Sequence, residues 1–272
     1  MPGPSAIFEK IFRLQMGKFG IEKYIAHLSI DCVIFGYRDN TLKVLLSKFR
    51  YGRGLWGLPG GYILKTESID KAAARILKER TALKDIYLEQ FRVFGDEKRI
   101  VDSHHNELIK SELRKFDSQR FDAETTKWMT SRFVCIGYYA LVDINKVNPQ
   151  PGELEERLEW LSIGNVPKMT HDHNEIITHA LEALRLNLDR KLIGFNLLPE
   201  TFTMKELQEL YEAVYDKPFA RNNFQKKILD LHVLERLEKK FTGAANKAPY
   251  LYRFRRNRPV DFVLKASRPG KP

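Results

Sequence analysis

Apolar residues recur along the chain with two different spacings, which predict where strands and helices lie. Residues 25–49 hold two runs rich in β-branched residues, joined at Arg38-Asp39-Asn40-Thr41. This pattern predicts a hairpin, because Asp and Asn tolerate the left-handed backbone of a tight turn. A helix is predicted over residues 69–81, with Ser68 as its N-cap. Short apolar runs at 86–94 and 131–143 predict two further strands.

The stretch from Glu97 to Thr130 is polar and has no strand pattern, so residues 97–130 are expected to be an inserted loop with a short helix at about 106–116. Asp172 and Glu175 have the spacing of a capping box that opens an amphipathic helix reaching about Leu188. Strands mixed with helices over the first 190 residues predict an α+β or α/β sandwich.

The pattern changes after about residue 190. Thr203-Met-Lys-Glu206 is a capping box, and a second helix is expected over 220–231, with Phe224, Ile228 and Leu231 facing the core. A turn is expected near Gly243–Asn246, followed by period-two alternation at 250–255. Helix, turn, helix and hairpin predict a winged helix-turn-helix domain.

Charge is distributed unevenly over the 272 residues. The formal net charge is +11, and residues 193–272 carry 16 Lys and Arg against 9 Asp and Glu. A basic C-terminal part suits nucleic acid, although a solvated basic surface would have the same composition. The two cysteines are isolated, and neither a membrane-length apolar run nor a signal peptide is evident. We therefore expect a cytoplasmic protein without a membrane partner.

The second helix of the predicted winged helix is suited to read DNA. Asn and Gln side chains can read adenine edges, and Arg and Lys can read guanine or hold phosphates. The candidate contacts to double-stranded DNA are Arg221, Asn222, Asn223, Gln225, Lys226 and Lys227, with Lys247, Arg253 and Arg255 in the hairpin.

The glycine-rich loop before the 69–81 helix leads into a motif with phosphate chemistry. Its spacing resembles the Nudix box of nucleoside-diphosphate-X hydrolases at Gly61, Glu67, Arg75, Leu77, Glu79 and Leu83. Ile76 and Arg80 replace glutamates of that box, and Ala82 replaces its glycine. Pyrophosphate hydrolysis needs Mg²⁺ held by several carboxylates, and Arg80 puts a fixed positive charge in their place. We therefore expect no hydrolase activity, no catalytic residues, no metal and no cofactor.

The same loop and helix could instead form a ligand pocket. The candidate effector-binding residues are Arg53, Gly60, Gly61, Glu67, Arg75, Glu79 and Arg80. A purely structural role is the alternative for each, since Arg75 and Glu79 can pair along the helix and the glycines can serve the turn.

The stretch from Leu197 to Leu229, with its FT-x-x-EL and NF-x-K-K motifs, resembles the winged helix of Nudix-related regulators. These are the NrtR-type repressors of NAD metabolism and their AraR-like relatives that control sugar utilisation. The resemblance implies α+β architecture: a Nudix-like α/β/α sandwich with a mixed sheet, followed by a winged helix-turn-helix. The expected divisions are an N-terminal helical segment (1–24), an effector-binding domain (25–190), a DNA-binding domain (191–260) and a flexible basic tail (261–272).

The resemblance also implies a homodimer that binds a DNA operator and responds to a small-molecule effector. Arabinose or another sugar, or an ADP-ribose-type nucleotide, would be that effector, and the loss of metal-binding acids slightly favours the sugar. Two rival hypotheses remain. One is an active Mg²⁺-dependent Nudix hydrolase with a nucleic-acid-binding appendage. The other is an interaction scaffold whose basic domain docks on protein.

Overall fold

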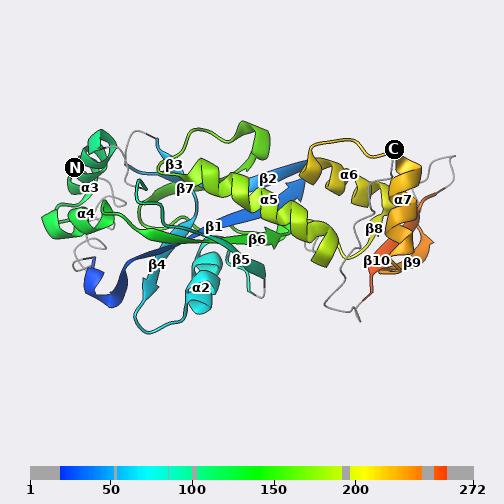
Figure 1. The fold of residues 1–272 in the computed structure, drawn as a ribbon, viewed down its shortest axis with the longest axis horizontal. Coiled ribbons are helices and arrows are strands. Elements are labelled where there is room, and N and C mark those ends of the chain that lie inside the picture. Colours follow the sequence, from blue (N-terminus) through cyan, green and yellow to red (C-terminus); the bar gives the residue numbers. More distant parts are fainter. Residues whose placement is uncertain are drawn as a thin grey trace, which may run out of the picture.

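A mixed seven-stranded sheet forms the centre of the larger part of the molecule, and a three-stranded sheet lies at the other end (Figure 1). The computed structural model describes residues 19–51, 54–84, 86–99, 103–191, 197–240 and 248–255. The large sheet consists of β1 (Tyr24–Arg38), β2 (Thr41–Phe49), β3 (Trp56–Gly57), β4 (Gly60–Leu64), β5 (Tyr87–Phe94), β6 (Val134–Val142) and β7 (Glu155–Ser162).

Strand order in this sheet is β3-β2-β1-β6-β5, with β4 paired to β1 and β7 paired to β2. The β1–β6 pair is parallel and the other pairs are antiparallel. Asp39 and Asn40 form the β1–β2 turn, each with φ of 54°. The predicted hairpin is therefore confirmed, and its two turn residues adopt the left-handed conformation that Asp and Asn tolerate.

One helix covers each face of the large sheet. Helix α2 (Ile69–Thr81) packs on the face that holds Ile30, Cys32 and Ile34 of β1, while α5 (His173–Lys191) packs on the opposite face. Alternate residues of a strand point to opposite faces, so β1 supplies both cores. The backbone N–H of Lys71 donates to the Ser68 hydroxyl over 3.3 Å, which confirms the predicted N-cap of α2. The predicted sandwich with a mixed sheet is confirmed.

Residues 103–130 differ from the expected loop. They form α3 (Ser103–Phe116) and α4 (Ala123–Met129), so the expected helix at 106–116 is longer and α4 was missed. Ile109, Leu113 and Phe121 bury themselves in a small core of their own. The sequence signal for α4 was Asp122, whose side chain caps the helix by accepting from Thr125 N over 2.8 Å. Short 3₁₀ turns are η1 (Ile21–Lys23), η2 (Ile144–Lys146) and η3 (Ile163–Asn165). Within the described ranges, no helix is long and apolar enough to span a bilayer.

The smaller domain is a winged helix-turn-helix. It consists of β8 (Phe202–Thr203), α6 (Met204–Tyr215), α7 (Arg221–Asp230), β9 (Leu234–Lys239) and β10 (Tyr250–Phe254), with strand order β8-β10-β9. Phe224, Ile228 and Leu231 are buried, as predicted. The two-residue β8 is too short to show a period in the sequence. The turn expected at 243–246 lies outside the described residues, as do residues 1–18 of the N-terminal segment and the 261–272 tail.

The winged helix is packed directly on the sandwich. Arg185 of α5 donates from Nε to the Val214 carbonyl over 2.8 Å, and the Tyr215 hydroxyl donates to the Arg185 carbonyl over 3.0 Å. A continuous apolar core runs from Leu184 and Leu188 of α5 into Leu207 and Leu210 of α6. Helix α5 therefore contacts both parts of the molecule.

Replacing Thr203 with alanine is expected to lower the free energy of unfolding by about 1 kcal/mol. The Thr203 hydroxyl accepts from Glu206 N over 3.2 Å, and Thr203 N donates back to the Glu206 carboxylate over 2.6 Å. The alanine variant loses one half of this capping box. Urea denaturation measures the change, and Thr203→Ser is the control that keeps the hydroxyl. Equal stability of all three proteins would contradict a role for the cap.

Candidate functional site

A cavity of about 340 Å³ opens beside the α2 helix, at the end of the large sheet that also carries the α3–α4 insertion. Six Phe and Tyr side chains line it: Phe19, Tyr24, Phe49, Tyr51, Tyr62 and Phe133. Three guanidinium groups line it as well, those of Arg75, Arg80 and Arg99. Ile109, Leu113 and Met129 of the insertion form a further wall. The cavity thus combines an aromatic surface with fixed positive charges.

Arg75 ties the glycine-rich loop to α2. Its Nε and Nη2 donate to the two oxygens of Glu67 over 3.0 and 2.7 Å, and Nη2 also donates to the Tyr62 carbonyl over 2.9 Å. Nη1 lies 3.3 Å from Glu79 Oε1. The hydrogen bond from Arg75 lowers the pKa of Glu67, against burial, and the Leu64 N–H helps. The predicted Arg75–Glu79 pair is present, but Glu67 is the stronger partner of Arg75.

Arg80 makes a different set of contacts. Its Nε lies 3.4 Å from Glu155 Oε2, and its Nη2 donates to the Gly60 carbonyl over 3.4 Å. Glu155 is buried and also accepts from the Ser47 hydroxyl over 2.7 Å and from Gly152 N. A Cβ at Gly152 would lie 2.9 Å from Nη1 and Nη2 of Arg80, so a larger residue there would require the guanidinium to shift.

Two glycines let the backbone pass close to side chains of the core. A Cβ at Gly60 would lie 2.5 Å from Asp31 Oδ1, and one at Gly61 would lie 3.1 Å from Ile76 Cδ1. Ile76 is 1% exposed and packs with Ile30 and Ile63. Ile76, which replaces a glutamate of the Nudix box, is therefore a core residue and offers no oxygen ligand to a metal.

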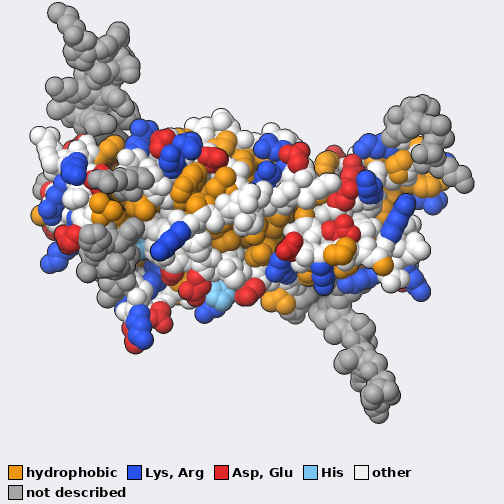
Figure 2. Space-filling model, turned by 90° about the horizontal axis from the view of Figure 1, so that it is seen from above, with side chains coloured by type: hydrophobic (Ala, Val, Ile, Leu, Met, Phe, Trp, Pro, Cys, Tyr) orange, Lys and Arg blue, Asp and Glu red, His pale blue; other side chains and the backbone are white. Residues whose placement is uncertain are grey.

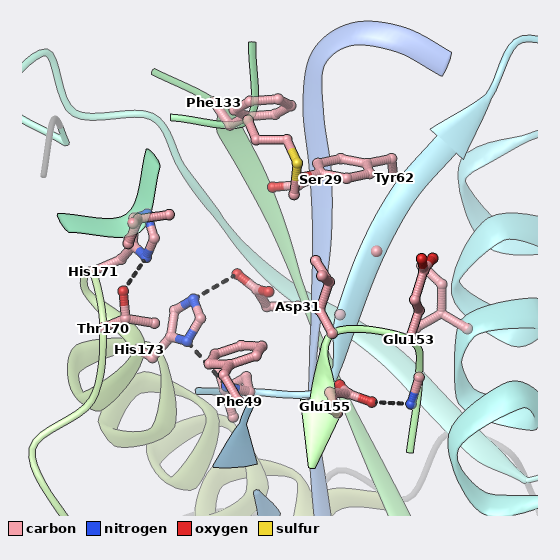
Figure 3. Close-up of a pocket in the computed structure, with 18 of the residues that line it drawn as sticks. Ser29, Asp31, Phe49, Tyr62, Phe133, Glu153, Glu155, Thr170, His171 and His173 are labelled. Atoms are coloured by element: carbon pink, nitrogen blue, oxygen red, sulfur yellow. Dashed lines mark hydrogen bonds and ion pairs between the residues drawn. The ribbon is translucent and has the colours of Figure 1, made fainter. Parts of the chain in front are cut away.

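A buried polar network closes the base of the cavity (Figure 3). His173 Nδ1 accepts from Leu58 N over 3.0 Å, and its Nε2 lies 3.6 Å from Asp31 Oδ2. Arg99 donates to both oxygens of Asp172 over 2.5 and 2.9 Å and lies 3.8 Å from Asp31. Burial alone would raise the pKa of Asp172, but the hydrogen bond and charge of Arg99 hold it below its usual value. These contacts join β1, the insertion and the start of α5.

The aromatic wall is supported by Trp128 of α4. Its ring lies 4.6 Å from that of Tyr62 and 5.0 Å from that of Phe133, and it stacks on Tyr24 at 6.1 Å. Phe19 packs on Tyr24 at 5.8 Å and on Trp128 at 6.5 Å. Such planar, apolar faces can stack on a ligand ring.

The acidic side chains near the cavity are engaged by protein donors. Glu67 is held by Arg75, and Glu155 by Arg80, Ser47 and Gly152. Glu153 pairs with Arg120 at 2.5 Å. Within the described part of the chain, no group of three or more His, Cys, Asp or Glu side chains is placed to hold a metal ion. A site for Mg²⁺ requires several oxygen ligands around one point, so these residues do not fit that ion.

The structure brings most of the candidate effector residues together. Gly60, Gly61, Arg75, Glu79 and Arg80 line the cavity, whereas Glu67 supports it from behind through Arg75. Arg53 lies outside the described residues. The sequence reasoning missed Asp31, Arg99, Glu155 and His173. Asp31 gave a signal, because it is a lone acid inside the apolar β1 run; Glu155 and Arg99 gave none.

The exposed side of α7 carries the candidate DNA contacts. Arg221, Asn222, Asn223, Lys226 and Lys227 are exposed and Gln225 is half-buried, while the opposite side of the helix packs in the core. Arg253 is exposed and pairs with Glu235 at 2.9 Å, and Arg255 donates from Nε to the Leu234 carbonyl over 3.2 Å. Lys247 lies outside the described residues. Lys and Arg side chains are spread over the end of the molecule that this domain forms (Figure 2).

Comparison with known proteins gives the same two parts. Residues 26–180 match the NUDIX domain family, and residues 194–254 match the family described as the NrtR DNA-binding winged helix domain. A relative from Acinetobacter baylyi, named ADPR responsive transcriptional repressor NtrR, is 25% identical over 234 residues, covering 84% of this chain and 81% of the relative.

Solved structures agree with this result. NrtR of Shewanella oneidensis has a TM-score of 0.63 at 28% identity, covering 84% of this chain and 94% of that one. The same protein complexed with a 27mer DNA has a TM-score of 0.63 at 27% identity, covering 84% and 93%. A Nudix-fold domain joined to a DNA-binding winged helix defines a Nudix-related transcriptional regulator. The chain belongs to the Nudix family, and its winged helix is of the NrtR type.

Proposed function

We propose that the protein is a transcriptional repressor that binds an operator through α7 and is released from it by ADP-ribose bound in the cavity beside α2. The observation that carries this proposal is the cavity itself, which places aromatic rings and guanidinium groups around one space. A nucleoside diphosphate sugar offers a ring that stacks and phosphates that pair with arginine. The name of the Acinetobacter relative, a repressor responsive to ADPR, supports the same ligand class.

A simple sugar such as arabinose, which the loss of acids slightly favoured, has no support among these relatives. The cavity does not favour it either. A pentose has no aromatic ring to stack on Tyr62 or Phe133 and no phosphate to pair with Arg80. The missing carboxylates do not by themselves favour a sugar, because guanidinium groups can hold a diphosphate as well as a metal can.

We further propose that residues 25–190 act as the effector-binding unit and residues 191–260 as the DNA-binding unit, and that the protein works as a homodimer. Two winged helices related by a twofold axis would read half-sites of a palindrome. ADP-ribose acts by binding the operator-bound and operator-free conformations with different affinity. The residues around α2 hold the ligand without hydrolysing it.

Operator binding measured with and without ADP-ribose tests the function. The expected result is a specific complex with the promoter of the protein's own operon, weakened by ADP-ribose about tenfold or more. Fluorescence anisotropy at fixed salt measures this, with arabinose as the matched control that should have no effect. Release by arabinose and not by ADP-ribose would show that arabinose is the effector. No operator binding at low salt would favour the protein-docking scaffold.

An assay for phosphate release separates the regulator from the hydrolase hypothesis. ADP-ribose incubated with the protein and Mg²⁺ should remain intact. Turnover above background that disappears in Glu79→Gln would show an active Nudix hydrolase and overturn the proposal of a non-hydrolysing sensor.

A further inference from the structure

We propose that the Arg80 guanidinium takes the place of the divalent metal of Nudix enzymes, so that this protein binds the diphosphate of its ligand without Mg²⁺. The inference rests on the proposed function, because it concerns how the same cavity holds ADP-ribose. Two features of the described side chains support it. Glu67 and Glu155 accept hydrogen bonds from protein donors, and the Arg80 guanidinium still has N–H groups that can donate to a ligand.

The carboxylates that could hold a metal have other partners. Glu67 accepts two hydrogen bonds from Arg75 and one from Leu64 N, which occupy both of its oxygens. Both oxygens of the buried Glu155 accept hydrogen bonds, from Ser47 and from Gly152 N. Glu79 is about half exposed and lies beside Arg75. A hard cation would have to displace these donors before it found its oxygen ligands.

Ile76 and Arg80 remove the remaining acidic positions in different ways. Ile76 packs against Gly61 and fills that space with an apolar side chain, which offers no oxygen ligand to a metal. Arg80 brings a permanent positive charge to the cavity wall, since a guanidinium is not deprotonated in a protein. The Nudix box therefore keeps a positive charge, which the Arg80 side chain supplies in place of a bound metal ion.

Arg80 is better placed than Arg75 to contact an anion. All three nitrogens of the Arg75 guanidinium have acceptors, namely Glu67, Glu79 and the Tyr62 carbonyl. Arg80 Nη2 has only the Gly60 carbonyl at 3.4 Å, and its Nη1 has no acceptor in the described part of the chain. Its side chain is 18% exposed and lines the cavity. The ion pair with Glu155 holds the guanidinium at the cavity wall, which favours the binding of a phosphate oxygen.

Isothermal titration of the full-length protein with ADP-ribose tests the inference, once in MgCl₂ and once in EDTA. The expected dissociation constants agree within about twofold, because the arginine supplies the charge in both buffers. A loss of more than about tenfold in EDTA would overturn the inference while leaving ADP-ribose as the ligand. Absence of binding in both buffers would overturn the proposed function instead.

Substitution of Arg80 provides a second test of the inference. Arg80→Ala should weaken ADP-ribose binding by about tenfold or more in both buffers, since it removes a charged hydrogen-bond donor. Lys78→Ala is the matched control, because it removes an exposed positive charge from the same helix at a residue that does not line the cavity, and it should bind as the wild type does. Retained operator binding without ligand shows that each variant is folded. If Arg80→Ala does not fold, the double variant Arg80→Ala/Glu155→Gln avoids an unpaired buried carboxylate and is measured in its place. Wild-type affinity in the folded variant would overturn the inference.

Discussion

Replacing Gln225 and Lys226 together with alanine is expected to weaken operator binding by about 100-fold while the protein stays folded. Both residues follow the buried Phe224 on α7, where Lys226 is exposed and Gln225 is half-buried. A helix in the major groove discriminates bases through such polar side chains, and each good contact contributes about 1–3 kcal/mol. The lysine adds a phosphate or guanine contact whose strength depends on salt.

Fluorescence anisotropy with labelled operator, at one fixed salt concentration, measures the loss. Lys71→Ala is the matched control, because it removes one exposed lysine from α2 in the other domain. The control should keep operator affinity, which excludes an effect of net charge alone. Unchanged affinity of the double variant would show that α7 does not read the operator.

Replacing Arg99 with methionine is expected to lower the free energy of unfolding by about 3 kcal/mol, although Arg99 lies in a segment that the sequence suggested to be a loop. Its side chain is 9% exposed and donates to Asp172 and to the Phe133 carbonyl. Methionine fills part of the volume but leaves the Asp172 and Asp31 carboxylates without this cation. A buried charge that loses its partner is costly, because burial has already removed most of its water.

Urea denaturation of the wild type and Arg99→Met at neutral pH checks this value. The exposed pair of Lys205 and Glu209 provides the control, since Lys205→Ala should cost less than about 1 kcal/mol. Equal effects of the two substitutions would contradict the importance of the buried network.

At acidic pH, the difference in the free energy of unfolding between Arg99→Met and the wild type should decrease. Arg99 holds the pKa of Asp172 below its usual value, against the effect of burial. Stability from a carboxyl with a lowered folded pKa is fully present above its unfolded pKa of about 4 and disappears as the pH falls through the folded pKa. The two proteins should therefore approach each other in stability below about pH 4.

Local features of the fold could be predicted from the sequence because they depend on neighbouring residues. The α2 helix begins after Ser68 and ends at Thr81, as its cap and spacing indicate. The Thr203–Glu206 capping box and the buried side of α7 are equally local. Each can be recognised within about one turn of helix, where side-chain spacing alone decides which group meets which.

The cavity could be predicted only in part because its remaining residues are distant in the sequence. Asp31, Arg99 and His173 meet only because β6 pairs with β1 and α5 begins beside them. Glu155 reaches Arg80 through β7, a short strand rich in Glu and Arg that was not predicted from the sequence. A single sequence contains no record of which charged residue pairs with which across such separations.

Helix α5 connects the base of the cavity directly to the winged helix domain. His173 in the first turn of α5 contacts the base of the cavity, and Arg185, about 18 Å further along, holds the last turn of α6. A displacement of about 1 Å at the cavity end, with the other end fixed, tilts such a rod by about 3°. In the proposed homodimer, ligand binding would then change the angle between the two winged helices, and operators whose half-sites differ in spacing by one base pair should differ in how strongly the ligand weakens their binding.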